Sequence, residues 1–266
     1  MNFPRDGLKL NVDDSGGEGL PVVFQHGLCG DAGQTREAFP DDARFRRITL
    51  ECRGHGASEA GDFSGLSIAT FTDDLAALIE TNGKAPVIVG GISMGAAIAL
   101  RLAARRPDLV RGLMLARPAW VIAAAPENMQ PNAEVGRLLD ALPAEEALRA
   151  FLDSARARAL AETAPDNLAS LRGFFTRRPQ AVTAALLQRI SADGPGVSEA
   201  QARAIRVPTL VIGTARDAIH PLSHAEALAA LIPDARFVTI TAKADNKVRY
   251  VSDFHATLTD FFEGFL

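Results

Sequence analysis

The sequence predicts an α/β protein with a mostly parallel, doubly wound sheet and an all-helical insertion. Short apolar runs alternate with helical patterns in both halves of the chain, as in a parallel sheet that is covered by helices on both faces. Between about residues 120 and 206 the helical patterns continue without a clear strand. We therefore expect a sheet-based core from residues 1–119 and 207–266, and a helical lid from residues 120–206.

The first half of the chain supplies most of the expected strands. Apolar runs that end in Gly-rich or polar loops are typical of buried strands. Five such runs occur before the insertion, at 8–12, 21–25, 47–50, 86–89 and 113–115. Helical spacing predicts helices at 71–81, which ends at Asn82-Gly83, and at 96–106, which ends at Pro107.

The insertion and the second half complete the pattern. Helices are expected inside the insertion at 135–142, 145–160, 168–175 and 180–190. After it, strands at 209–212 and 236–240 alternate with helices at 223–231 and 251–266. Ligands of such sheets bind beyond the carboxyl ends of the strands, so the loops after the strands are where we look for chemistry.

Composition restricts the classes of function. A chain of 266 residues, 47% hydrophobic, can bury a large core, and a net charge of −4 argues against nucleic acid and against a basic membrane-binding face. No apolar run approaches the roughly 20 residues that span a bilayer, and residues 1–6 lack the features of a signal peptide, so we expect a cytoplasmic protein. Cys29 and Cys52 are expected as reduced thiols.

No pattern in the sequence calls for a cofactor. The His and Cys spacing does not suggest a metal site, and no Gly-rich nucleotide-binding loop is present. The partner we expect is a small-molecule substrate or ligand, and nothing in the sequence specifies an oligomeric state.

The segment Gly91-Ile92-Ser93-Met94-Gly95 has the pattern of a nucleophile elbow. It follows a predicted strand and opens an Ala-rich helix, and small residues flank the serine, as a strained turn with close backbone contacts requires. Ser93 is therefore the candidate nucleophile. An oxyanion hole needs two N–H donors. The amide of Met94 and the amide of Leu28, just after His26-Gly27, are the candidates.

Together these pieces resemble the α/β-hydrolase family, in its branch of esterases and epoxide-hydrolase-like proteins with a helical lid. The matching segments are His26-Gly27, Arg53-Gly54-His55-Gly56-Ala57-Ser58, Gly91 to Gly95, and Gly213 with Asp217. The resemblance implies a Ser, Asp, His triad in that chain order, acting on an ester or related carbonyl, with Asp217 as the acid. Read from its sequence position alone, Asp217 has an alternative role as the cap of a helix beginning near Pro221.

The sequence departs from this family where the histidine is expected. After the last strand, residues 241–246 read Thr-Ala-Lys-Ala-Asp-Asn. Four of the five histidines have other expected places. His26 and His55 belong to structural loops, His224 starts a helix, and His255 lies inside the last helix. The fifth, His220, lies three residues after Asp217 on a loop expected to border the pocket.

Three interpretations follow for the missing base. In the first, His220 acts as general base, for which an unperturbed pKa near 6.5 is suitable. In the second, Lys243 forms a dyad with Ser93, but Asp217 and Asp245 nearby would raise the pKa of Lys243 and favour a salt bridge. In the third, the base is lost and the protein binds a ligand without hydrolysing it. We hypothesise a serine hydrolase of small esters, lactones or thioesters with a non-standard base, and keep a ligand-binding or signalling protein on this scaffold as the alternative.

Two further residues follow the strand that precedes the insertion. Trp120 is expected to pack in the core or against the lid. Arg117 could bind an anionic substrate, but pairing with a carboxylate of the lid is the more usual outcome for such an arginine.

Overall fold

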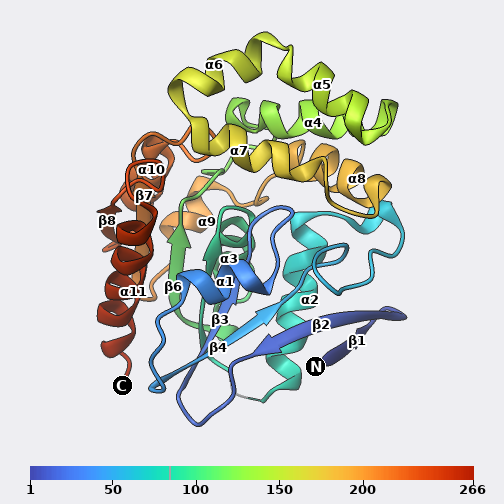
Figure 1. The fold of residues 1–266 in the computed structure, drawn as a ribbon. Helices are drawn as coiled ribbons and strands as arrows, with labels where there is room; N and C mark the ends of the chain where they lie inside the picture. Colours follow the sequence, from blue (N-terminus) through green and yellow to red (C-terminus); the bar gives the residue numbers. More distant parts are fainter. Residues whose placement is uncertain (84) are drawn as a thin grey trace.

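The predicted sheet is confirmed in the computed structural model, which describes residues 1–83 and 85–266 (Figure 1). Eight strands lie in the order β1-β2-β4-β3-β5-β6-β7-β8. The first two pair antiparallel with their neighbours, and the other six are parallel. The strands are β1 (Asn2–Arg5), β2 (Leu8–Asp14), β3 (Leu20–Gln25), β4 (Phe45–Leu50), β5 (Val87–Ile92), β6 (Val110–Ala116), β7 (Thr209–Thr214) and β8 (Arg236–Ile240).

Helices cover both faces of this sheet. Side chains alternate between the faces along each strand, so Ile88 packs on one side while Val87 and Val89 pack on the other. One face is covered by α2 (Ile68–Thr81), α3 (Met94–Arg105) and α10 (Leu222–Leu231), and the opposite face by α1 (Ala32–Ala38) and α11 (Lys247–Glu263). This division is the doubly wound arrangement that the alternation of strands and helices predicts.

Five helices between β6 and β7 form a separate layer. In Figure 1 they lie above the carboxyl ends of the parallel strands. They are α4 (Gln130–Ala141), α5 (Ala144–Leu152), α6 (Ala155–Thr163), α7 (Pro165–Phe174) and α8 (Gln180–Ser191). We call this segment the helical cap. It places side chains directly over the loops in which the sequence locates the candidate chemistry.

The prediction of a single helix over residues 145–160 is wrong, because the structure divides this segment into α5 and α6. Asp153 closes α5, and the Ser154 side chain then caps α6 by accepting a hydrogen bond from the Ala157 N–H. Serine competes for backbone hydrogen bonds and favours a helix start over a helix interior.

Several short elements were not predicted from the sequence. They are β1, α1, α9 (Glu199–Arg203) and the 3-10 turns Phe63–Gly65, Pro107–Leu109 and Glu127–Met129. Each has too few residues to show a period. No helix within residues 1–83 and 85–266 has the length and apolar character needed to cross a membrane.

Candidate active site

Ser93 lies on a strained turn between β5 and α3. Its backbone has φ 57° and ψ −111°, a conformation that non-glycine residues rarely adopt. The turn is tight because the chain passes close by: a Cβ at Gly95 would lie 2.4 Å from the carbonyl oxygen of Gln25, and a Cβ at Gly91 would lie 2.5 Å from the Gly95 backbone. Strain that neighbouring backbone enforces in this way is typical of functional residues.

The loop after β3 faces Ser93 with the second candidate oxyanion donor. Leu28 and Ser93 line one cavity. The loop is fixed by the Gly27 N–H, which donates to the Gln34 side chain at 2.6 Å, and by the Gly30 N–H, which donates to the Gly27 carbonyl at 2.9 Å. Met94 begins α3, so its N–H has no acceptor within the helix. Both amides predicted for an oxyanion hole thus come from well-fixed turns beside Ser93.

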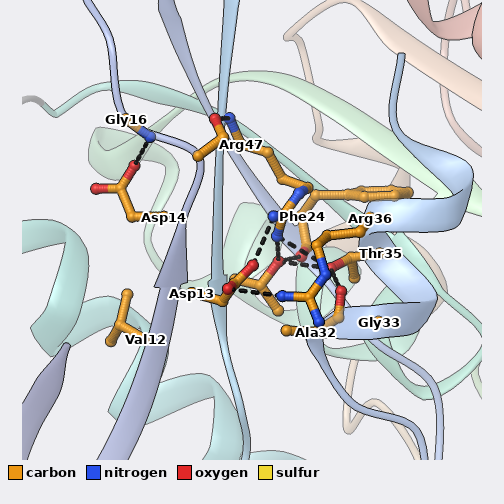
Figure 2. Close-up of polar contacts among 12 residues, drawn as sticks. Val12, Asp13, Asp14, Gly16, Phe24, Ala32, Gly33, Thr35, Arg36 and Arg47 are labelled. Atoms are coloured by element: carbon orange, nitrogen blue, oxygen red, sulfur yellow. Dashed lines mark hydrogen bonds and ion pairs between the residues drawn. The ribbon is translucent and has the colours of Figure 1, made fainter. Parts of the chain in front are cut away.

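A charge network centred on the buried Arg47 side chain holds α1, which carries Gln34, against the sheet. Figure 2 shows Asp13 of β2 between two arginines. Arg47 of β4, 4% exposed, reaches Asp13 at 2.5 Å and the hydroxyl of Thr35 at 3.2 Å, while Arg36 of α1 reaches Asp13 at 2.8 Å. The network therefore ties the helix behind the oxyanion loop to two strands.

Asp217 and His220 form a hydrogen-bonded pair on the loop after β7. The His220 Nδ1 atom lies 3.0 Å from each carboxylate oxygen of Asp217. The backbone N–H groups of Ile219 and His220 also donate to Oδ1, at 3.2 and 3.0 Å. The alternative role of Asp217 as a cap of α10 is not what the structure shows, since the N-cap of that helix is Pro221 and has no side-chain capping bond.

The helical cap contributes a clamp to this pair. The Asn167 amide of α7 donates from Nδ2 to Asp217 Oδ1 at 2.9 Å, and its Oδ1 accepts the Ala218 N–H at 2.8 Å. Asn167 is buried. Docking of the cap therefore helps to fix the orientation of the Asp217 carboxylate.

Arg117 is the other partner of Asp217, and the expectation that it would pair with a cap carboxylate is wrong. Its Nε and one NH2 group donate to Asp217 Oδ2 at 3.0 and 2.5 Å, and its second NH2 group donates to the Tyr250 hydroxyl at 2.9 Å. The reason is topological: β6 and β7 are neighbours, and the Arg117 N–H itself donates to the Ile212 carbonyl of β7 at 2.7 Å.

These contacts set the protonation of the pair. Burial opposes ionisation of Asp217, but the neighbouring His220 and Arg117 outweigh it and lower the pKa of Asp217 below its ordinary value. Burial lowers the pKa of His220 below its ordinary value, and the charge of Arg117 adds to this, although Asp217 acts in the opposite direction. At neutral pH the pair is therefore an ionised carboxylate beside a neutral imidazole.

A cavity of about 220 Å³ connects the candidate residues. Ser93, Leu28, His220, Arg117 and Lys243 line it from the sheet side. The cap side is formed by Asn132, Asp166, Asn167, Ser170, Leu171 and Phe174. Among the residues that the structure describes, no hydrogen bond joins the Ser93 side chain to His220. The structure thus brings Ser93, His220 and Lys243 to one cavity, with Asp217 behind the imidazole.

Lys243 forms its ion pair with a residue that the sequence did not suggest. Its Nζ lies 3.8 Å from Asp166 of α7, whereas Asp245 pairs with Arg216. A salt bridge of Lys243 was expected with Asp217 or Asp245, and the predicted partner is wrong. The cap brings Asp166 over the loop after β8, where it pairs with Lys243.

The other histidines make contacts outside the cavity. His26 accepts the Cys52 N–H at Nε2 and contacts the Gly27 carbonyl through Nδ1, and His55 packs against it with ring centroids 4.8 Å apart. His224 Nδ1 lies 3.1 Å from the Ala119 carbonyl.

Of the remaining residues singled out by the sequence, Cys29 lines the cavity, and the others make their contacts outside it. His255 of α11 contacts the Glu37 carbonyl, and the buried Trp120 donates to the Asp193 carbonyl at 2.9 Å. Cys29 and Cys52 are both buried free thiols, and burial raises the pKa of Cys29 to about 12.

Asn132 and Asn167 were missed by the sequence analysis, although a pattern marks both. Asn132 lies on the buried face of α4 together with Val135 and Leu139, and Asn167 shares a buried face with Leu171 in α7. An amide on the apolar face of an amphipathic helix must find a partner when it is buried. That position, rather than any motif, identifies them as candidate site residues.

The sheet order, the elbow after β5 and the helical cap define an α/β-hydrolase-fold protein. Residues 21–244 match the family model described as the alpha/beta hydrolase fold, and the chain belongs to this family. It is 32% identical to the putative non-heme bromoperoxidase BpoC of Mycobacterium tuberculosis strain H37Rv, over 88% of this chain and 89% of that protein. It is 34% identical to the pimeloyl-[acyl-carrier protein] methyl ester esterase of Chromobacterium violaceum, over 82% and 84% of the two chains.

The fold likeness extends over whole chains. The enol-lactonase from Burkholderia xenovorans LB400 has a crystal structure that matches with a TM-score of 0.74 and 26% identity, covering 99% of this chain and 100% of the lactonase. With the esterase, this neighbour supports a hydrolase function for the chain, as the sequence predicted.

Proposed function

We propose that this protein is a serine hydrolase of small esters, lactones or thioesters, with Ser93 as nucleophile and His220 as general base. The observation that carries the proposal is the shared cavity: Ser93 and His220 line it together, and Asp217 holds His220 through Nδ1. In the family pattern the base follows β8; here the imidazole comes from the loop after β7 and is oriented by the carboxylate of the same loop.

The tautomer of His220 supports this role. An ionised Asp217 can only accept hydrogen bonds, so two carboxylate oxygens at 3.0 Å from Nδ1 favour a proton on Nδ1. The Arg117 NH2 group lies farther from Nδ1, at 3.2 Å, and donates instead to Asp217 Oδ2 at 2.5 Å. The Nε2 lone pair is then free to take a proton. The lowered pKa of His220 keeps this form dominant at neutral pH.

The proposed reaction proceeds in two halves. Ser93 Oγ attacks the carbonyl carbon while His220 Nε2 takes the hydroxyl proton, and the Leu28 and Met94 amides stabilise the oxyanion. Collapse breaks the carbon–oxygen or carbon–sulfur bond, and the leaving alcohol or thiol receives the proton from His220. Water, deprotonated by His220, then attacks the acyl-enzyme and releases the acid, and the proton returns to Ser93.

The substrate class follows from cavity size and from the relatives. A volume of about 220 Å³ suits a small acyl group. One relative is an esterase for a methyl ester and one structural neighbour is an enol-lactonase, so an ester or lactone is the class that both support. The polar lining from the cap indicates that this acyl or alcohol group carries polar atoms.

A second candidate function is binding of such a ligand without hydrolysis. It is favoured by two observations: Ser93 has no hydrogen bond to His220 in the described part of the chain, and Arg117 competes with His220 for Asp217. In this alternative the site retains the oxyanion donors and the cavity but does not activate the serine.

Labelling with a fluorophosphonate probe separates the two. The hydrolase proposal predicts covalent modification of Ser93 in the wild-type protein, none in Ser93→Ala, and turnover of p-nitrophenyl esters by wild type alone. A wild-type protein that takes up no probe and turns over no ester would reject the hydrolase and favour the binding protein. Lys247→Met serves as a matched control, because Lys247 is exposed and pairs with Glu37 outside the cavity.

A further inference from the structure

We infer that Asn132 of the helical cap is a specificity-determining residue that accepts a hydrogen bond from a hydroxyl or amide N–H group of the substrate. The inference rests on the proposed function in one respect, that the cavity beside Ser93 receives the substrate. It adds that the substrate has a hydrogen-bond donor, which neither the fold nor the nucleophile elbow implies.

The Asn132 side chain is buried and has no hydrogen-bond partner in the part of the chain that the structure describes. The residue is 5% exposed and lines the same cavity as Ser93. Its Oδ1 atom is buried without a hydrogen-bond partner, and no hydrogen bond of its amide is found within residues 1–83 and 85–266. Buried amide oxygens almost always have a partner, so an unpaired amide oxygen on a residue that lines a cavity points to a ligand that supplies the donor.

The other polar groups of the cap that line the cavity are already engaged. Asn167 uses both ends of its amide, on Asp217 and on the Ala218 N–H. The Ser170 hydroxyl donates to the Asp166 carbonyl at 3.0 Å, and the Asp166 carboxylate faces Lys243. Asn132 thus differs from these neighbours, because none of the described residues forms a hydrogen bond with its amide oxygen.

The helix that carries Asn132 is held firmly in place. Just before α4, the Asn128 amide donates to the carbonyls of Ala119 and Ile219, at 2.9 and 2.7 Å, and so ties this end of the cap to the loop of His220. One turn after Asn132, a Cβ at Gly136 would lie 2.9 Å from Leu187 Cβ of α8, so α4 and α8 are in close contact. The acceptor is therefore preorganised rather than free to swing towards another partner.

The chemistry that fits is an ester, lactone or thioester whose acyl or alcohol part carries a donor. A plain alkyl group in contact with Asn132 would remove water from the amide without replacing its hydrogen bond, which weakens binding and transition-state stabilisation. A hydroxyl or amide N–H group makes that bond. The wild-type protein should consequently discriminate between matched substrates with and without the donor.

The test compares p-nitrophenyl esters in matched pairs, propionate with lactate and butyrate with β-hydroxybutyrate. We expect kcat/KM of the wild type to favour the hydroxylated member of at least one pair by about tenfold or more. Asn132→Leu, of similar size, should abolish that preference, because the hydroxylated ester loses its hydrogen bond and the plain ester no longer desolvates the amide. Ser170→Ala, which alters a cavity-lining hydroxyl that is already bonded within the chain, should keep the preference.

A thermal melt accompanies the kinetics, because Asn132→Leu should melt at the wild-type temperature or above when the amide has no structural role. Three results would overturn the role of Asn132 and leave the proposed function standing. They are a preference that survives in Asn132→Leu, a wild type that favours neither hydroxylated ester, and a strongly lowered melting temperature of Asn132→Leu. If wild type hydrolyses no ester at all, binding of methyl lactate against methyl propionate, followed by NMR in wild type and Asn132→Leu, still decides the role of Asn132. Tighter binding of lactate that Asn132→Leu removes supports it, and equal binding overturns it.

Discussion

Arg117 should control the pH dependence of the reaction, because its guanidinium lies against both members of the acid–base pair. One of its NH2 nitrogens is 2.5 Å from Asp217 Oδ2 and 3.2 Å from His220 Nδ1. This positive charge disfavours protonation of the imidazole and contributes to the lowered pKa of His220. Arg117→Gln removes the charge and keeps a polar side chain.

The size of the effect follows from the separation. Two unit charges about 4 Å apart interact by about 1 kcal/mol in water and about 4 kcal/mol at an effective dielectric constant of 20. An interaction of this order opposes protonation of His220, so removal of the charge should raise the pKa of His220. A general base acts when deprotonated, so the acid limb of kcat/KM moves to higher pH with that pKa.

The assay is the pH–rate profile of ester hydrolysis by wild type, Arg117→Gln and Arg117→Lys. The lysine variant keeps the charge and should keep the acid limb near that of wild type, even though it loses the bidentate contact. Breaking a buried ion pair costs about 3–5 kcal/mol, so the profile is recorded below the melting temperature of each variant. An acid limb that stays in place, or moves to lower pH, in a folded Arg117→Gln protein would refute the electrostatic reasoning.

Two predictions concern stability. Arg47→Met should lower the free energy of unfolding by about 1–3 kcal/mol in urea denaturation, because the Arg47 side chain is 5% exposed and its hydrogen bonds to the Thr35 and Thr49 hydroxyls are lost. Arg36→Met acts on the same Asp13 carboxylate from a side chain that is 58% exposed and should cost less than about 1 kcal/mol; equal losses would argue against a structural role for the buried Arg47 contacts. Burial lowers the pKa values of His26 and His55. Below about pH 6.5 the unfolded chain therefore binds more protons than the folded protein. The free energy of unfolding should fall with decreasing pH by up to about 1.4 kcal/mol per pH unit for each of these histidines. His55→Leu should reduce that slope by one histidine's share, and an unchanged slope would contradict the assignment.

The sequence predicted the features that depend on short-range pattern. Apolar runs and the flanking turns located seven of the eight strands, and the elbow placed Ser93 between the correct strand and helix. These follow from local rules of burial and turn chemistry. The missed elements, such as β1 and α1, are stabilised by tertiary contacts and not by a periodic pattern of their own.

The polar partners of the site could not be read from the sequence, because they join segments far apart in the chain. Arg117 meets Asp217 through the adjacency of β6 and β7, and Lys243 meets Asp166 only because the cap folds over β8. The choice of His220 as candidate base rested on elimination and on its distance of three residues from Asp217. The structure adds the contact between those two side chains and the cavity that His220 shares with Ser93.

The role of His220 as the replacement base is decided by the rate at which a fluorophosphonate labels Ser93 at neutral pH in His220→Gln and in Lys243→Met. Each variant keeps a side chain of similar size and removes one candidate base. We expect a loss of about 100-fold or more for His220→Gln, the contribution typical of a general base, and a change of less than about threefold for Lys243→Met. A large loss in Lys243→Met with His220→Gln near the wild-type rate would contradict this role of His220.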